Sequence, residues 1–120
     1  MFTETLTGHD GVIGIACEGK LTVDDLKRMH ALLHERFVVG KKPGLVVDLT
    51  GFDGYEGFSA LREDLKLVVA HRNDFDRIAV IGDQEWIAWG TSLARAVTSG
   101  EMRWFVPRDR DAGAEWARRG

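Results

Sequence analysis

The sequence predicts a single α/β domain, residues 1–120, in which helices cover a mostly parallel β-sheet. Its hydrophobic pattern switches repeatedly between a period of two residues, typical of strands, and a period of about 3.6 residues, typical of helices. A chain of 120 residues has the usual length of one domain and can bury a core without metal or disulfide bonds. The 44% hydrophobic and 29% charged residues exclude the composition of a disordered chain.

The chain is expected to begin with a β-hairpin. Residues 2–6 alternate between apolar and polar side chains, and residues 12–17 form a second, mostly apolar run. The intervening His9, Asp10 and Gly11 are typical of a turn. The two runs therefore predict an antiparallel pair at one end of the sheet.

A first helix should follow the hairpin. Thr22, followed three residues later by Asp25, is typical of a helix start, where a side-chain cap and an acid meet the positive end of the helix dipole. The expected apolar face recurs at helical spacing and consists of Leu26, Met29, Leu33 and Phe37. We therefore expect this face to pack against the sheet.

Strands and helices should then alternate to the end of the chain. The apolar run 45–47 predicts a strand that is covered on both faces and ends at Asp48. The elements expected after it are a helix over about 55–70, a strand over 77–81, a helix over 84–97, a strand over 102–106 and a helix from 109 to about 118. The resulting order, β-β-α-β-α-β-α-β-α, implies parallel strands joined by crossover helices.

The charge and composition argue against nucleic acid and membranes as partners and against secretion. A net charge of -3 and a pI near 5.8 provide no long-range attraction to nucleic acid or to anionic membranes. No apolar run approaches the ~20 residues of a membrane span, and the first residues lack the features of a secretory signal. The single cysteine, Cys17, cannot form an internal disulfide, and its apolar strand predicts a buried side chain. We therefore expect a cytoplasmic protein.

Two segments carry a resemblance to a known family. VVDLTGF at residues 46–52 and HRNDFDRIAVIGD at residues 71–83 resemble the SpoIIAA-like family of small bacterial proteins, and the similarity continues through Glu85-Trp86 and Arg103-Trp104-Phe105. The resemblance implies a STAS-like fold, shared in outline with anti-sigma-factor antagonists and, more loosely, with CRAL-TRIO lipid-carrier domains. It thereby implies a binding or regulatory domain whose partner is a protein or an apolar, lipid-like molecule.

The resemblance does not carry over the phosphorylation switch of the antagonists. Those proteins place a phosphorylatable serine at the start of the helix that follows the Asp-Leu-Ser strand end. In this sequence the corresponding position is Gly57, and Ser59 lies two residues later. We therefore expect that Ser59 is not an essential switch.

Acidic residues at the expected strand ends give an enzyme as the alternative reading. Asp48, Asp53 and Asp83 could converge as oxygen ligands for a divalent cation in phosphotransfer or hydrolysis. However, Asp83 is explained as a helix N-cap and Asp53 as a residue of a glycine-rich turn. No nucleophile, general base or phosphate-binding loop is recognisable beside them. The sequence therefore favours a domain that is not an enzyme and has no cofactor.

Two histidines on the first expected helix are candidate metal ligands. His30 and His34 have the i, i+4 spacing that allows two imidazoles to share a metal ion. Ala31 stands where an HExxH motif has its general-base glutamate, so the motif is absent. The sequence therefore favours partly exposed surface histidines and no metal site.

Aromatic residues are the favoured binding residues. The apolar arc of the helix expected at 84–97 spans about half its circumference, more than is needed to cover a sheet. Trp86 lies near the middle of this arc and is expected to pack in the core, whereas Trp89 lies toward its margin and could line a groove or a homodimer contact, with core packing as the alternative. Tyr55 and Phe58 begin a helix at the carboxyl end of a strand, where α/β sheets place their ligands. Together these four residues form the predicted site for a ligand or partner.

Overall fold

The described part of the chain forms a five-stranded sheet with helices on both faces. In the computed structural model, the described part of the chain comprises residues 1–7, 11–36, 42–57, 59–60, 62–63, 75–82 and 101–119. Its elements are β1 (Phe2–Thr5), β2 (Val12–Leu21), α1 (Val23–Arg36), β3 (Gly44–Tyr55), β4 (Arg77–Ile81), β5 (Glu101–Phe105), a short 3-10 helix (Pro107–Asp109) and α4 (Arg110–Arg118). The predicted α/β class is confirmed.

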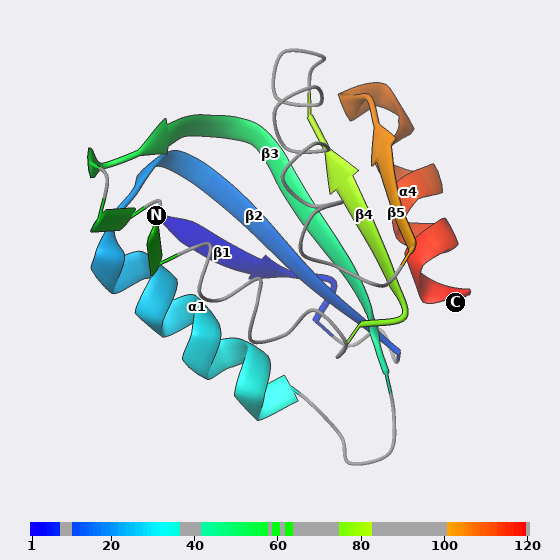
Figure 1. Ribbon diagram of the computed structural model, residues 1–120. Coiled ribbons are helices and arrows are strands. Elements are labelled where there is room, and N and C mark those ends of the chain that lie inside the picture. The colour runs from blue at the N-terminus through cyan, green and yellow to red at the C-terminus, as the bar shows by residue number, and fades with distance from the viewer. Residues whose placement is uncertain are drawn as a thin grey trace.

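The strands follow one another across the sheet in chain order, β1-β2-β3-β4-β5 (Figure 1). β1 pairs antiparallel with β2, which confirms the N-terminal hairpin. The pairs β2-β3, β3-β4 and β4-β5 are all parallel. The predicted mostly parallel sheet is therefore correct. The helix expected over 84–97 lies outside the described residues.

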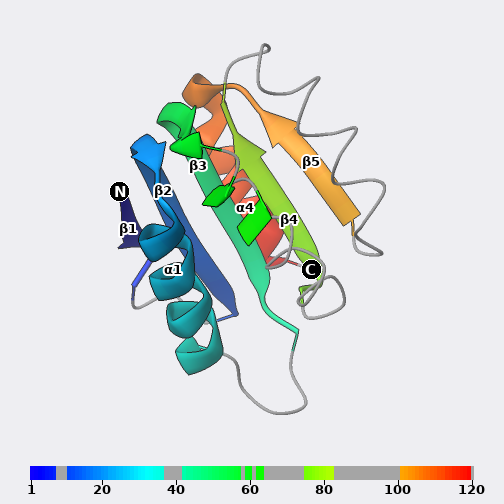
Figure 2. The ribbon, with the colours of Figure 1, turned by 60° about the vertical axis from the view of Figure 1, so that its left-hand side comes forward.

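Side chains alternate between the two faces of the sheet, and each face has its own apolar cluster. Figure 2 shows α1 in front of the sheet and α4 behind it. On the α1 face, Leu26, Met29 and Leu33 of the helix are buried against the sheet together with Cys17. On the α4 face, the buried residues are Val12, Val46, Ala79, Ile81 and Ala117. Phe37, the last member of the predicted face of α1, lies outside the described residues.

The start of α1 has the predicted cap. The backbone N–H of Asp25 donates to Oγ1 of Thr22 at 3.0 Å, and the backbone N–H of Thr22 donates to Oδ2 of Asp25 at 3.0 Å. This reciprocal pair of hydrogen bonds satisfies N–H groups that would otherwise lack partners at the helix start. Because the cap depends only on residues close in sequence, it could be recognised without the structure.

The strand predicted to end at Asp48 continues to Tyr55, so the predicted glycine-rich turn is wrong. The pairing of β3 with β2 shifts register twice in this extension, so β3 has one extra residue at each shift. The residues of β3 that face the α1 cluster are consequently Leu45, Val47, Leu49, Phe52 and Tyr55. The two bulges therefore keep apolar side chains on one face although their spacing is no longer two.

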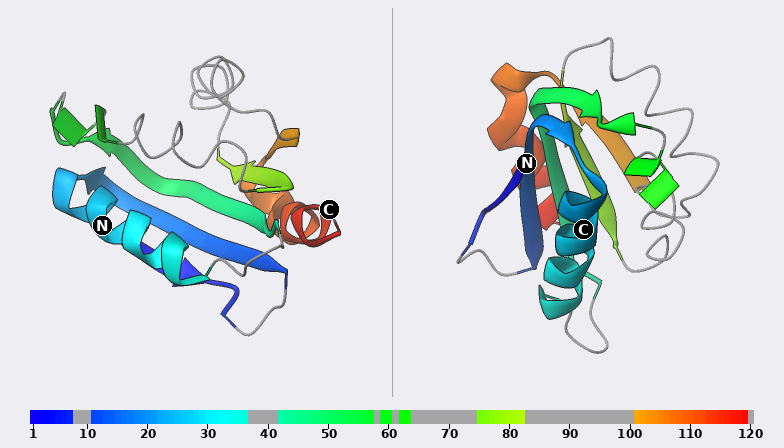
Figure 3. Two further views of the ribbon diagram at one scale, coloured as in Figure 1. Left: turned by 60° about the horizontal axis from the view of Figure 1, so that its bottom comes forward. Right: turned by 90° about the vertical axis from the view of Figure 1, so that its left-hand side faces the viewer.

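The extended β2 and β3 run past the end of β4 toward the start of α1 (Figure 3). At this end, the backbone N–H of Glu56 donates to the carbonyl oxygen of Leu21 at 2.8 Å. The helical residues that follow begin at Gly57, with a φ of 85°, so Tyr55 belongs to the strand and not to the helix.

Among the described residues, the helices are too short or too polar to be candidate membrane spans.

Candidate functional site

Only one of the four predicted aromatic site residues can be placed. Tyr55 is half-buried at the end of β3 and packs against the α1 cluster. Its ring contacts the buried Phe52 edge to face, with the ring centroids 5.3 Å apart. Phe58, Trp86 and Trp89 lie outside the described residues. The proposed grouping of these aromatic side chains thus stays a prediction.

Another tryptophan, Trp104 of β5, lies on the α1 face of the sheet. The strand register places it beside Val80 of β4, which in turn lies beside Val47 of β3. All three side chains belong to, or pack against, the apolar cluster under α1. Tyr55 is in a different row, farther along β3 than Val47. The α1 face therefore has an apolar row across its last three strands that ends in an indole ring.

The indole of Trp104 has an unsatisfied polar atom. Its Nε1 is buried but has no hydrogen-bond partner, and among the described residues no other buried side-chain nitrogen or oxygen atom is in this state. Almost all buried donors in native proteins find an acceptor, and a missing acceptor costs about 1–3 kcal/mol. This N–H is therefore a candidate contact for a bound molecule that carries an acceptor oxygen.

The opposite face has a polar cluster at the point where β3 passes the end of β4. Nε of Arg110, at the start of α4, donates to Oδ2 of Asp48 at 2.6 Å, and its Nη2 donates to Oγ1 of Thr50 at 3.0 Å. The backbone N–H of Thr50 also donates to Oδ1 of Asp48, at 2.9 Å. These contacts attach the start of α4 to the sheet.

The same contacts decide between a metal-ligand role and a structural role for Asp48. Burial alone would raise the pKa of its carboxyl group, but hydrogen bonds from Thr50 and Arg110 outweigh burial and hold the pKa below its ordinary value. The carboxylate is thus ionised near neutral pH and paired with a guanidinium group. A divalent cation at Asp48 would have to displace Arg110, and the geometry gives Asp48 a structural role.

The other acids of the alternative enzyme site do not join Asp48 in the described structure. Asp53 is exposed on the extended part of β3, and Asp83 lies outside the described residues. Within the described ranges, no three His, Cys, Asp or Glu side chains are grouped as metal ligands would be. The described acids therefore offer no assembled cation site.

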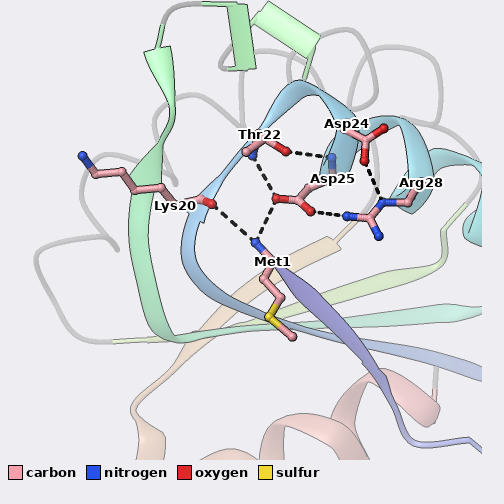
Figure 4. Close-up of polar contacts among 6 residues, drawn as sticks. All are labelled: Met1, Lys20, Thr22, Asp24, Asp25 and Arg28. Atoms are coloured by element: carbon pink, nitrogen blue, oxygen red, sulfur yellow. Dashed lines mark hydrogen bonds and ion pairs between the residues drawn. The ribbon is translucent and has the colours of Figure 1, made fainter.

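A second polar cluster surrounds Asp25 (Figure 4). Its carboxylate accepts from the Met1 ammonium group at 2.9 Å and from Nη2 of Arg28 at 2.6 Å, in addition to the bond from the backbone of Thr22. The hydrogen bond from the Met1 ammonium and that from the Thr22 backbone outweigh burial and depress the pKa of Asp25 far below its ordinary value. The carboxylate thereby joins the N-terminus to the first turn of α1, which gives this cluster a structural role.

Gly57, the position that the resemblance aligns with the phosphorylatable serine of the antagonists, lies in the described part of the chain. Gly57 is exposed and has a positive φ of 85°, and Ser59 is exposed in the helical segment that follows. The expectation that Ser59 is not an essential switch stays a prediction.

Two contributors to these sites, Trp104 and Arg110, were not among the predicted site residues. The alternation of residues 102–105 places Met102 and Trp104 on one face of β5, and this pattern was visible in the sequence. The sequence gives no sign that the indole N–H lacks an acceptor. The pairing of Arg110 with Asp48 joins residues 62 positions apart, which no local pattern indicates.

Comparisons with known proteins agree with this fold. The family model described as SpoIIAA-like matches residues 12–118. Among solved structures, the chain is similar to an uncharacterised protein with a SpoIIAA-like fold from Shewanella loihica PV-4, with a TM-score of 0.78 and 30% identity. The match covers 98% of this chain and 92% of the other. A comparison with curated proteins gave no match.

Proposed function

Because this chain belongs to the SpoIIAA-like family, whose domains are typically non-enzymatic binding or regulatory modules, we propose that it binds a small, largely apolar molecule through the α1 face of its sheet. The observation that carries this proposal is the buried Nε1–H of Trp104, which lacks an acceptor. The ligand would supply one acceptor oxygen, as a fatty acid or another lipid-like molecule does.

The chemistry around Trp104 defines the ligand. Val47 and Val80 lie in the same row of the sheet and Met102 on the same face of β5, so these described neighbours of Trp104 on the sheet are apolar. An apolar body would be favoured there by the release of water from hydrocarbon surface. A single polar group would be fixed by the indole N–H, because that donor gains a hydrogen bond only when the ligand is bound.

A small molecule fits this donor better than a protein surface. Nε1 is buried, so a partner that docks on the outside of the domain does not reach it. A molecule that enters the interior does. Tyr55, Phe58, Trp86 and Trp89 remain part of the proposal as residues that extend the site along the apolar body of the ligand. Catalysis has no part in the proposal, because Asp48 is engaged by Arg110 and Thr50.

Replacing Trp104 by phenylalanine tests the proposal. Trp104→Phe keeps an aromatic ring but removes the donor, so a fluorescent long-chain fatty acid should bind about tenfold more weakly, the equivalent of one hydrogen bond. Trp116→Phe is the matched control. Trp116 packs on the α4 face, with its ring 6.0 Å from that of Phe105 and the guanidinium of Arg77 5.0 Å above it.

The control should bind the probe as the wild type does. Equal affinities for wild type and Trp104→Phe, or an equal loss in both variants, would contradict the proposal. Unfolding of both variants in urea, without the probe, shows whether each is folded.

A further inference from the structure

Two histidine side chains contact each other on the outer side of α1 and have no role in the proposed ligand site. His34 is exposed and His30 is half-buried one helical turn before it. Their Nε2 atoms are 2.9 Å apart, in hydrogen-bond contact without metal, whereas their ring centroids are 4.7 Å apart. The rings are tilted by 23°. The two imidazoles therefore converge at their Nε2 atoms, and Nε2 is one of the two imidazole nitrogens that bind metals in proteins.

We propose that His30 and His34 form a binding site for a transition-metal ion with cis coordination positions near 90°, of which Ni²⁺ and Cu²⁺ are the representatives. Metal–imidazole bonds measure about 2.0–2.1 Å. Two such bonds to nitrogens 2.9 Å apart enclose an angle of about 90° at the metal. A tetrahedral angle would require nitrogens about 3.3 Å apart. The spacing thus fits the tetragonal geometry of Cu²⁺ and Ni²⁺ better than that of Zn²⁺.

The helix holds the pair in place. Met29 and Leu33, which neighbour the histidines in sequence, are buried against the sheet and fix the rotation of α1. Residues four apart lie one above the other on a helix face, so the backbone sets the separation of the two rings. Little conformational freedom is lost when the metal binds, which favours the chelate over two independent imidazoles.

The site has open coordination positions. Two imidazoles occupy two positions of a metal that takes four or six ligands. In the described ranges no third His, Cys, Asp or Glu joins the pair. Further donors, from water or from other groups, would complete the coordination. The site uses residues distinct from Trp104, so it stands independently of the proposed ligand site.

Calorimetric titration of the whole chain with Ni²⁺, and in parallel with Cu²⁺, tests the proposal. The wild type should bind one ion per chain, and His30→Ala and His34→Ala should each weaken this binding about 100-fold, because the chelate is lost. Mg²⁺ should not bind, since it prefers oxygen ligands. The paramagnetic Ni²⁺ should broaden the ring signals of both histidines in the NMR spectrum of the wild type.

A control variant keeps the number of histidines and changes only their spacing. His34→Ala combined with Ala31→His places the imidazoles at adjacent positions that face different directions, and Ala31 is exposed. This double variant should bind Ni²⁺ as weakly as His34→Ala. Wild-type affinity in the double variant, or no difference between wild type and the single variants, would overturn the proposal. Melting temperatures measured in the presence of chelator should differ by only a few degrees among the variants, because Ala31 and His34 are exposed and His30 is half-buried and outside the apolar cluster.

Discussion

Replacing Gly44 by alanine should destabilise the protein by about 3 kcal/mol or more, the largest loss that we expect from any single methyl group. Gly44 begins β3, beneath the end of α4. A Cβ atom at this position would lie 2.1 Å from the carbonyl oxygen of Ala117 and 2.7 Å from its carbonyl carbon. Both atoms belong to the backbone and cannot rotate away. The helix would have to move off the sheet, and the packing of the buried Ala117 would be lost.

Urea unfolding of Gly44→Ala and of a matched control measures this effect. Gly51 lies in the same strand, but a Cβ atom there would meet its nearest neighbour, Cγ of Glu18, at 3.5 Å, an ordinary contact. Gly51→Ala should therefore change the free energy of unfolding by less than about 1 kcal/mol. If the two variants were equally stable, α4 would not pack on β3 as closely as described.

Replacing Asp25 by alanine should lower the free energy of unfolding by about 2 kcal/mol at neutral pH. The change removes the carboxylate half of the reciprocal cap of α1, in which Asp25 accepts from the backbone N–H of Thr22, and it also removes the contacts of that carboxylate with the Met1 ammonium group and Arg28. The loss is moderated because both cationic partners are largely exposed, with 80% and 63% of their side-chain surface accessible. Each cation therefore regains water when its partner is removed.

The effect of Asp25 should depend on pH in a defined direction. Because its pKa is depressed in the folded protein, the charged carboxylate stabilises the fold at every pH above its ordinary unfolded pKa of about 3.9. That contribution is lost as the pH falls through the folded-state pKa. The difference in stability between wild type and Asp25→Ala should therefore be constant from pH 7 to about pH 5 and shrink below about pH 4.

A neighbouring acid provides the control for Asp25. Asp24 is 80% exposed and pairs only at the surface, with Nε of Arg28 3.2 Å from its Oδ2. Asp24→Ala should therefore cost less than about 0.5 kcal/mol in the same urea titrations. Similar losses for the two variants, or a difference that grows in acid, would contradict the role assigned to Asp25.

Much of the fold could be predicted because its signals are local. The run Arg77–Ile81 forms a strand over the predicted residues, since its apolar residues are buried on both faces. The cap of α1 needs only Thr22 and Asp25. The length of β3 could not be predicted, because Gly51, Asp53 and Gly54 are typical of a turn. Only the pairing with β2 keeps this segment extended, and the bulges that result have no local signature.

The candidate site was less accessible to sequence reasoning. An excess of apolar residues at helical spacing indicates aromatic site residues on helices, and Trp104 lies on a strand, where this signal does not occur. An unsatisfied donor is a property of the whole packed structure. The role of Asp48 likewise changed from candidate metal ligand to structural acid only when the fold brought Arg110 to it.

Native mass spectrometry of the protein purified from its source cells tests the central claim, that this domain binds a small apolar molecule at Trp104, most directly. The wild type should carry an added, lipid-sized mass that is released on denaturation, and Trp104→Phe prepared in parallel should carry it at lower occupancy. The spectrum also reports whether the chain forms a homodimer. A wild type whose mass is that of the polypeptide alone, or equal occupancy in both proteins, would contradict the claim.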